Sequence, residues 1–208
     1  MGRWEPNGRE RLAKAALELY GERGFEQTTV AEIAKRAGLT ERTFFRHYAD
    51  KREVLFAGSG ELERLFTEAV ADAPLAAAPL DALAAGLDAV CVMFEERREF
   101  AGKRHAVISA TAELRERELI KLASLAAALA DTLRRRGVPE PAASLTAETG
   151  VAVFKVAFER WITADEQRPL ARLARDSLEQ LKAVATGGAP AGAAGEAAPV
   201  PAEARPGG

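Results

Sequence analysis

The chain has 208 residues, 48% of them hydrophobic, and its 29 basic and 31 acidic side chains give a formal net charge of −2. This length and composition predict a folded globular protein, and the mildly acidic balance argues against binding nucleic acid over the whole surface. No apolar run is long enough for a signal peptide or a membrane span, and Cys91 is the only cysteine, so we expect a cytoplasmic protein with no disulfide and no membrane contact.

Other function classes are disfavoured by the same composition. One cysteine and two histidines are too few ligands for a zinc site, and no metal or cofactor is expected. The five serines are scattered and lie in no recognisable nucleophile motif, so we do not expect an enzyme.

Positive charge is local. Residues 1–56 carry 11 basic and 9 acidic side chains, which leaves 18 basic and 22 acidic for the rest of the chain. Within residues 35–52 the counts are 6 and 2. A basic segment therefore lies inside an acidic protein.

Apolar residues recur at spacings of three and four, and no convincing strand pattern appears, which predicts an all-α protein. A first helix is expected at about Gly8–Glu22, ended by Gly24. Thr29 and Glu32 form a capping box for a short second helix, which Gly38 ends.

The third helix follows almost at once. Thr40 is its expected cap, and it runs from about Glu41 to Tyr48. The pattern Asp-Lys-Arg-Glu from Asp50 then predicts a fourth helix from Lys51 to Val70, with two glycines inside it.

The remaining helices are predicted from apolar stripes. Phe100 and Gly102 are expected to mark a bend between two of them, and residues 187–208 are nearly all Gly, Ala, Pro and Glu, which predicts a disordered tail. In order, the predicted helices are Asp81–Glu96, one carrying Val107, Ile108 and Leu114, one carrying Leu119 to Leu133 that ends in Arg134–Arg136, one carrying Leu145 to Val156, and one carrying Leu170 to Val184.

Two short helices joined by a tight turn, the second of them basic, indicate a helix-turn-helix. On the second helix Phe44 and Tyr48 are four residues apart and should face the core. Arg42 and Arg46 have the same spacing and should share the outer face, where arginine can read guanine edges in the major groove.

The run TTVAEIAKRAGLTERTFFRHYADKREVLF, residues 28–56, resembles the DNA-binding domain of TetR-family transcriptional regulators. That family has a threonine at the start of the second helix, a small polar cap on the recognition helix, and an aromatic-rich stretch followed by a lysine. Phe45 stands where the family usually has tyrosine, so it lacks the hydroxyl that would donate to phosphate. The DNA contacts that we expect are Thr29, Thr40, Glu41, Arg42, Thr43, Phe45, Arg46, His47 and Lys51.

Each of these residues also has a structural interpretation. The basic side chains are either groove and phosphate contacts or a solvated helix face. His47 either contacts DNA or is held by the backbone. The threonines are caps in any case. Glu41 either interacts with the helix dipole or accepts from a cytosine amine.

The resemblance implies three parts: a helix-turn-helix domain at residues 1–56, a helical ligand-binding and dimerisation domain at 57–186, and the tail at 187–208. Two sets of candidates follow, and for each member the alternative is plain packing in the core of one chain. The ligand-binding candidates are Cys91, Phe94, Phe100, His105, Val107, Phe154, Phe158 and Trp161. The dimer candidates are Leu145, Ala152, Val153, Val156, Leu170, Leu173, Leu178 and Leu181.

We therefore expect a sequence-specific regulator, acting as a ligand-responsive homodimeric repressor on a palindromic operator. Its partners would be double-stranded DNA, a second copy of itself and a small-molecule effector. Two alternatives stay open: a regulator controlled by a partner protein, and an enzyme or carrier with an incidental helix-turn-helix.

Overall fold

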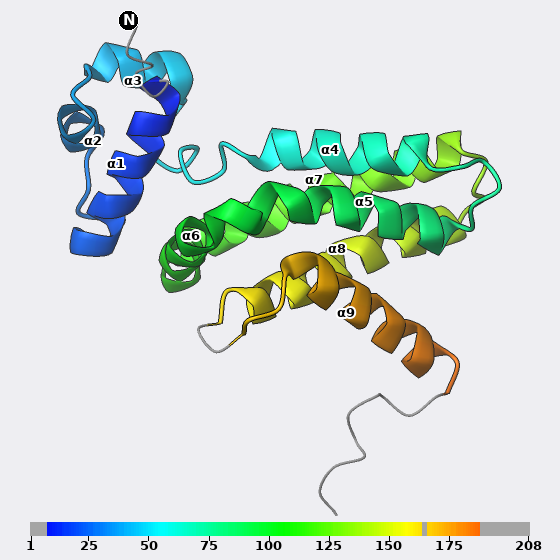
Figure 1. The fold of residues 1–208 in the computed structure, drawn as a ribbon. Helices are drawn as coiled ribbons and strands as arrows, with labels where there is room; N and C mark the ends of the chain where they lie inside the picture. Colours follow the sequence, from blue (N-terminus) through cyan, green and yellow to red (C-terminus); the bar gives the residue numbers. More distant parts are fainter. Residues whose placement is uncertain (1–7, 164–165, 188–208) are drawn as a thin grey trace, which may run out of the picture.

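The computed structural model describes residues 8–163 and 166–187. Within these ranges every regular element is a helix and no strand is present, which confirms the predicted all-α class. Three N-terminal helices form one unit, and a short connection joins them to a larger bundle (Figure 1). In chain order the elements are α1 (Gly8–Arg23), α2 (Val30–Arg36), α3 (Glu41–His47), α4 (Ser59–Asp72), α5 (Pro79–Phe94), the 3₁₀ helix η1 (Glu95–Arg97), α6 (Arg98–Ala110), α7 (Ala112–Arg135), α8 (Ala142–Trp161) and α9 (Leu170–Ala185).

The N-terminal unit is built around one side chain from each of its helices. Leu12 of α1, Ile33 of α2 and Phe44 of α3 are fully buried together, so the predicted inward face of α3 is confirmed. Gly24 and Gly38 end the first two helices with φ of +84° and +65°, a region that favours glycine.

This hydrophobic core does not stop at the third helix. Ile108, near the end of α6, and Leu114, near the start of α7, are fully buried in the same cluster as Leu12 and Phe44. The corner between α6 and α7 therefore supports the N-terminal unit directly. The predicted boundary at residue 56 lies between α3 and α4, but the hydrophobic packing crosses it.

Residues 51–58 form successive turns, so the prediction that the fourth helix begins at the start of this segment was wrong. Backbone N–H groups of Leu55 and Phe56 donate to carbonyls three residues earlier. Val54, Leu55 and Phe56 are all buried, and three consecutive residues cannot share one face of an α-helix. The α-helix begins only at Ser59.

Side chains from the larger bundle hold this turn segment. Arg104 of α6 donates from Nε to the Leu55 carbonyl at 2.6 Å, and its guanidinium lies 5.2 Å from the centre of the Phe56 ring. Arg104 also pairs with Glu118, and Lys103 pairs with Glu99, so these two cations already have partners within the chain. Further ion pairs join the segment to α7: Arg52 with Glu113, and Glu53 with Arg117 and Lys121.

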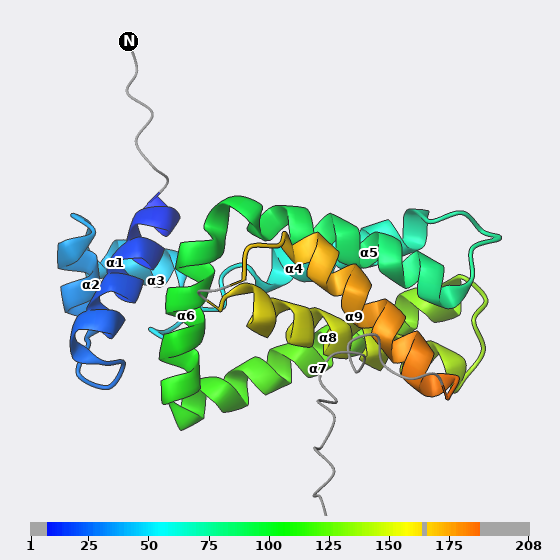
Figure 2. The same cartoon turned by 60° about the horizontal axis from the view of Figure 1, so that its bottom comes forward.

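The larger bundle packs its helices closely. In Figures 1 and 2, α4, α5 and α7 run lengthwise beside one another, and α8 and α9 lie against the side of α5 and α7 that faces away from α4. A Cβ added at Gly86 would lie 2.5 Å from Cδ2 of Phe66, and one added at Gly150 would lie 2.5 Å from Cδ1 of Leu83. An added Cβ at either crossing would force a neighbouring core side chain to move.

The bend between the fifth and sixth helices was predicted at the wrong residues. It lies at the 3₁₀ turn Glu95–Arg97, and α6 runs without interruption through Phe100 and Gly102. Leu114 belongs to α7, because the helix α6 ends before Thr111 and α7 begins after it.

The C-terminal helices follow the predicted order. Gly137, with φ of +87°, follows the basic last turn of α7, and Pro169 directly precedes α9. Apart from Gly187, the predicted tail at residues 187–208 lies outside the described residues. None of the helices in the described ranges is long and apolar enough to cross a bilayer.

Candidate nucleic-acid interface

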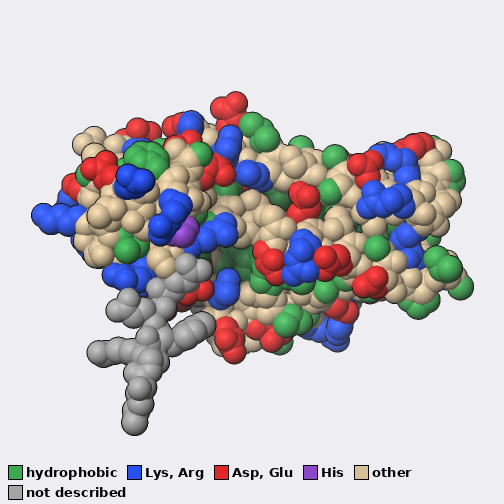
Figure 3. All heavy atoms as spheres, turned by 90° about the horizontal axis from the view of Figure 1, so that it is seen from above, with side chains coloured by type: hydrophobic (Ala, Val, Ile, Leu, Met, Phe, Trp, Pro, Cys, Tyr) green, Lys and Arg blue, Asp and Glu red, His purple; other side chains and the backbone are tan. Residues whose placement is uncertain are grey.

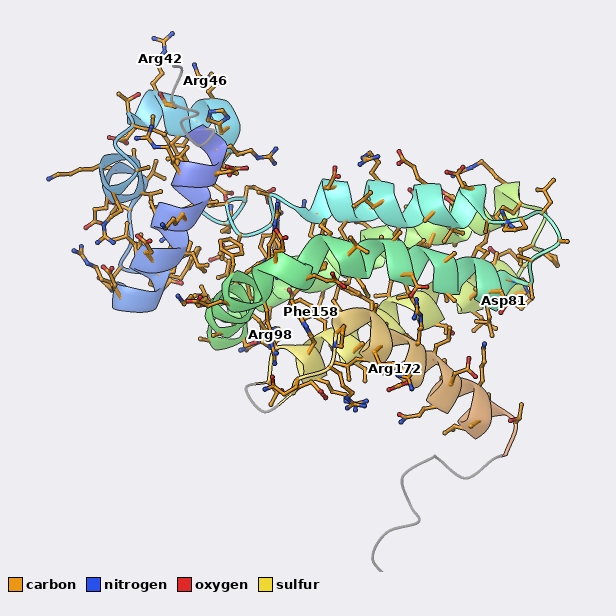
Figure 4. All side chains as sticks on the ribbon, viewed as in Figure 1. Arg42, Arg46, Asp81, Arg98, Phe158 and Arg172 are labelled. Atoms are coloured by element: carbon orange, nitrogen blue, oxygen red, sulfur yellow. The ribbon has the colours of Figure 1, made fainter. Side chains whose placement is uncertain are left out.

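The outer face of α3 presents arginine and one aromatic ring to solvent. Arg42, Phe45 and Arg46 are exposed, and Arg42 and Arg46 project away from the rest of the molecule (Figure 4). Viewed onto this side, Lys and Arg side chains gather with a histidine over the N-terminal unit (Figure 3). The predicted outer face of the helix is thus free to enter a groove.

The opposite face of α3 is anchored. Phe44 is fully buried, and the buried Tyr48 donates from its hydroxyl to the Arg9 carbonyl at 3.0 Å. Arg11 donates to the Ala37 carbonyl at 2.6 Å, next to the turn between α2 and α3. These contacts hold α3 against α1 and α2, so its exposed face has a fixed position.

The two predicted threonine caps are both present. Thr29 and Glu32 make the full capping box, and the Thr29 N–H that donates to Glu32 holds the pKa of that carboxyl below its usual value. Thr40 accepts from the Thr43 N–H at 3.2 Å, and the hydroxyls of these two residues lie 3.0 Å apart. Both threonines are exposed at helix N-termini, so a phosphate contact there stays a prediction.

His47 and Glu41 lie at the two ends of α3. The His47 ring is half-buried near the start of α1, since a Cβ at Gly8 would lie 3.6 Å from its Nε2. Glu41 is exposed in the first turn, where it interacts favourably with the helix dipole. DNA contact by either residue stays a prediction.

Phe45 is 55% exposed, and it is the one large apolar side chain among described residues 8–56 that is exposed. Its ring meets Phe44 edge-on, with centroids 5.5 Å apart. The ring is therefore fixed in place while most of its outer surface faces solvent. This arrangement suits contact with an apolar base or sugar surface.

Lys51 faces the protein, contrary to its predicted role as a phosphate contact. Its Nζ donates to the carbonyls of Phe25, Glu26 and Thr28 at 2.9, 3.3 and 3.1 Å, and it lies 4.3 Å from the centre of the Phe25 ring. An ammonium has three N–H donors, and all three are used here. The lysine holds the loop between α1 and α2, so a phosphate contact does not fit this geometry.

The structure brings five of the predicted ligand-binding residues together. They form an aromatic cluster whose rings contact one another, for example Phe94 with Phe158 at 5.5 Å and His105 with Phe158 at 6.2 Å between centroids. Figure 4 places Phe158 near Arg98, which lies 5.9 Å from the Trp161 ring. The members of the cluster are Phe94, His105, Phe154, Phe158 and Trp161.

The other ligand-binding candidates lie elsewhere. Cys91 is fully buried in the apolar core, and burial raises the pKa of its thiol to about 12, so it is a neutral core residue. Phe100 and Val107 instead line a hollow between α1 and α6. The described residues hold no group of three or more His, Cys, Asp or Glu side chains that could bind a metal ion.

The eight dimer candidates divide by burial. Val153, Leu170, Leu173 and Leu178 are buried in the core of their own chain, so a partner cannot reach them, and their assignment to an interface was wrong on that ground. Leu145, Ala152, Val156 and Leu181 are exposed on α8 and α9, and partner contact through these four stays a prediction. Val184 of α9, 59% exposed, belongs with them; the apolar repeat of that helix already pointed to it.

The role of Arg104 was missed, because nothing in the sequence signals that its guanidinium reaches a backbone carbonyl 49 residues away. The same holds for Arg9, which donates to the Ala57 carbonyl. Only the folded chain brings these partners together.

Two family models match the chain. Residues 12–57 match the model for bacterial regulatory proteins of the tetR family, and residues 77–186 match the MftR C-terminal domain. The second match covers more than half of the chain.

Curated relatives match only a part of this chain and a part of their own length. The chain is 38% identical over 82 residues to the HTH-type transcriptional regulator TcmR of Streptomyces glaucescens, covering 39% of this chain and 36% of that protein. It is 35% identical over 54 residues to the putative mycofactocin biosynthesis transcriptional regulator MftR of Mycobacterium tuberculosis, covering 26% and 27%. These matches span about a third of each relative's length or less.

Solved structures share the fold. FadR from Bacillus subtilis with stearoyl-CoA has a TM-score of 0.59 at 19% identity, covering 83% of this chain and 96% of that one. The triclosan complex of SmeT, the repressor of a Stenotrophomonas maltophilia efflux pump, has a TM-score of 0.62 at 21% identity, covering 86% and 90%. Those ligands belong to those proteins; the similarity to this chain is one of fold.

Proposed function

The chain belongs to the TetR family of bacterial transcriptional regulators, and from this premise we propose that it is a ligand-responsive repressor that binds a palindromic operator as a homodimer. In this proposal residues 1–56 bind DNA and residues 57–186 bind the effector and the second subunit. The family is one of regulators, and we assign no enzymatic activity.

The observation that carries the DNA-binding role is the exposed face of α3. Arg42 and Arg46 are four residues apart on a helix whose other face is fully buried, so both guanidinium groups point outward together. Arginine binds guanine through two parallel hydrogen bonds in the major groove. Two copies of α3 would read half-sites separated by about 34–36 Å or a multiple of it.

Alanine variants of these two arginines test the assignment. Arg42→Ala and Arg46→Ala should each weaken binding to a selected genomic fragment by about 1–3 kcal/mol and relax the base preference at one position of each half-site. Arg64→Ala is the matched control, because Arg64 is an exposed arginine on α4 that pairs with Glu61 and Glu68. If both α3 variants bound the fragment as the wild type does, the assignment of α3 to the major groove would be wrong.

Communication between the two parts would pass through residues 51–58. This segment follows the recognition helix directly, and Arg104 of α6 and the ion pairs to α7 hold it. An effector that favours another position of α6 would move the segment, and with it α3. Such an effector must bind the two positions with different affinity.

The aromatic cluster is our candidate for the effector site. FadR and SmeT, which share this fold, bind fatty-acyl-CoA and triclosan, so stearoyl-CoA and triclosan are suitable first probes. A rise in Tm with either probe, reduced in Phe158→Ala, would support an apolar effector in the cluster.

One observation favours a second candidate function. The rings of the cluster are in contact with one another, which is the arrangement expected if a partner protein, and no small molecule, controls the regulator. Absence of stabilisation by either probe, together with a protein that copurifies and alters operator binding, would support this second candidate.

A further inference from the structure

A hollow of about 580 Å³ lies between α1 of the N-terminal unit and α6 of the larger bundle. These helices lie side by side in Figures 1 and 2. The volume falls within the range of about 300–1,000 Å³ that small-molecule sites occupy. The hollow is separate from the aromatic cluster, whose members do not line it.

The lining has an apolar part. Leu17 and Gly21 come from α1, and Phe100, Ala106 and Val107 come from α6. Phe100 is 42% exposed, and no atom lies within 4 Å of the position where Gly21 would carry a Cβ. The hollow thus exposes apolar surface at a concave place, and it opens to solvent beside the exposed Gly21.

The carboxylates around the hollow are already paired. Glu22 pairs with Arg36 at 2.9 Å, and Glu99 pairs with Lys103 at 2.5 Å. A third lining carboxylate, Glu18, lies 3.5 Å from the same Arg36 guanidinium. Because each of these carboxylates already has a cation beside it, a cationic molecule would gain little here and would still lose hydration, while an anionic one would meet three carboxylates.

Lys14 is the exception among these charged groups. It lines the hollow, and among the described residues no hydrogen bond or ion pair of its side chain is present. Its ammonium is therefore available as a donor to one oxygen or nitrogen acceptor.

From this lining we infer that the hollow is a second small-molecule site, for an uncharged apolar molecule with one hydrogen-bond acceptor. A molecule bound there contacts α1, which packs directly against the recognition helix, and α6, which holds residues 51–58. It would fix the spacing of the two parts without entering the aromatic cluster. This inference does not depend on the cluster being an effector site.

The test uses the full chain and 6-propionyl-2-(dimethylamino)naphthalene, an uncharged aromatic ketone whose carbonyl is a hydrogen-bond acceptor and whose fluorescence rises and shifts to shorter wavelength in apolar surroundings. Wild-type protein should bind one probe molecule per chain. Gly21→Phe places a ring in the open space and should weaken binding by about tenfold or more, and Phe100→Ala removes apolar lining and should weaken it by about three- to tenfold.

Gly102→Phe is the matched control. Gly102 is also a helical glycine with no atom within 4 Å of its added Cβ, but it does not line the hollow, so this variant should bind the probe as wild type does. Circular dichroism checks that each variant is folded. The inference would be overturned if the wild-type protein did not bind the probe, or if Gly21→Phe and Phe100→Ala both bound it as tightly as the wild type does. Loss of binding as chain concentration rises would assign the hollow to a second copy, and would overturn it too.

Discussion

The Lys51 side chain connects two loops of the N-terminal unit. Its ammonium connects the start of the turn segment to three carbonyls of the loop between α1 and α2, and Tyr20 donates to the Lys51 carbonyl at 2.6 Å. The recognition helix lies between these two loops in the chain. Lys51 therefore links the two segments that flank α2 and α3.

Replacing this lysine should cost stability. Lys51→Met leaves the three carbonyls without their donor, and we expect the free energy of unfolding to fall by about 1–3 kcal/mol in urea titrations. Lys35→Met is the control, because Lys35 is exposed on α2 and should leave stability unchanged. A phosphate contact would give the opposite pattern: wild-type stability, weaker DNA binding and a smaller salt dependence.

At the residue scale, local interactions were predictable and long-range ones were not. The caps at Thr29 and Thr40 join residues three apart, so the sequence alone indicates them. The backbone carbonyls to which Lys51 and Arg104 donate lie more than twenty residues away, and long flexible side chains can reach several places. Only the tertiary fold selects among these places.

At the scale of elements, the helices of the larger bundle approach one another most closely at glycines. Gly86 of α5 faces the fully buried Phe66 of α4, and an added Cβ would lie 2.5 Å from its ring and 2.8 Å from Cγ2 of Val70. Neither side chain has free space to move into, since both are in the core.

We expect Gly86→Ala to destabilise the protein by about 1–3 kcal/mol, through overpacking, although alanine has the higher helix propensity. Gly102→Ala on α6 is the matched control. Nothing lies within 4 Å of its added Cβ, so it should stabilise the helix by up to about 1 kcal/mol. Thermal unfolding of the two variants measures the difference, and equal Tm changes would show that the crossing tolerates a methyl group.

The existence and order of the helices followed from apolar periodicity, but several of their ends did not. Periodicity reports which face is buried, and it fails where a whole segment is buried, as at Val54, Leu55 and Phe56. Glycine also misled the prediction: Gly102 lies inside a continuous helix, while the bend falls at Glu95–Arg97, which contains neither glycine nor proline.

At the scale of the whole molecule, two hydrophobic cores meet at the corner between α6 and α7. Ile108 and Leu114 lie in the core of the N-terminal unit, while Ala101 and Leu125, on the same two helices, lie in the core of the larger bundle. A change in the position of α6 would therefore alter the packing of both hydrophobic cores. In the proposed function, this shared packing would carry a movement of α6 to α3.

The exposed apolar residues of α8 and α9 test the remaining part of the proposal, the homodimer. Leu145, Ala152 and Val156 share one face of α8, and Leu181 and Val184 are exposed on the neighbouring α9. The double variant Val156→Glu, Leu181→Glu places two charges on this surface without disturbing the core. We expect light scattering to show a dimer for wild type and a monomer for the variant.

The same variant should distinguish the binding of one subunit to a half-site from the binding of a dimer to the full palindrome. Binding to a single half-site should be unchanged, because α3 is intact, whereas binding to the full palindrome should fall by about 100-fold or more as the second contact is no longer intramolecular. Leu75→Glu is the matched control, since Leu75 is 89% exposed in the connection between α4 and α5, outside both α8 and α9, and should leave both the mass and the operator affinity unchanged. If the double variant kept the mass and affinity of wild type, the subunits would have to meet elsewhere, and the exposed residues of α8 and α9 would need another partner.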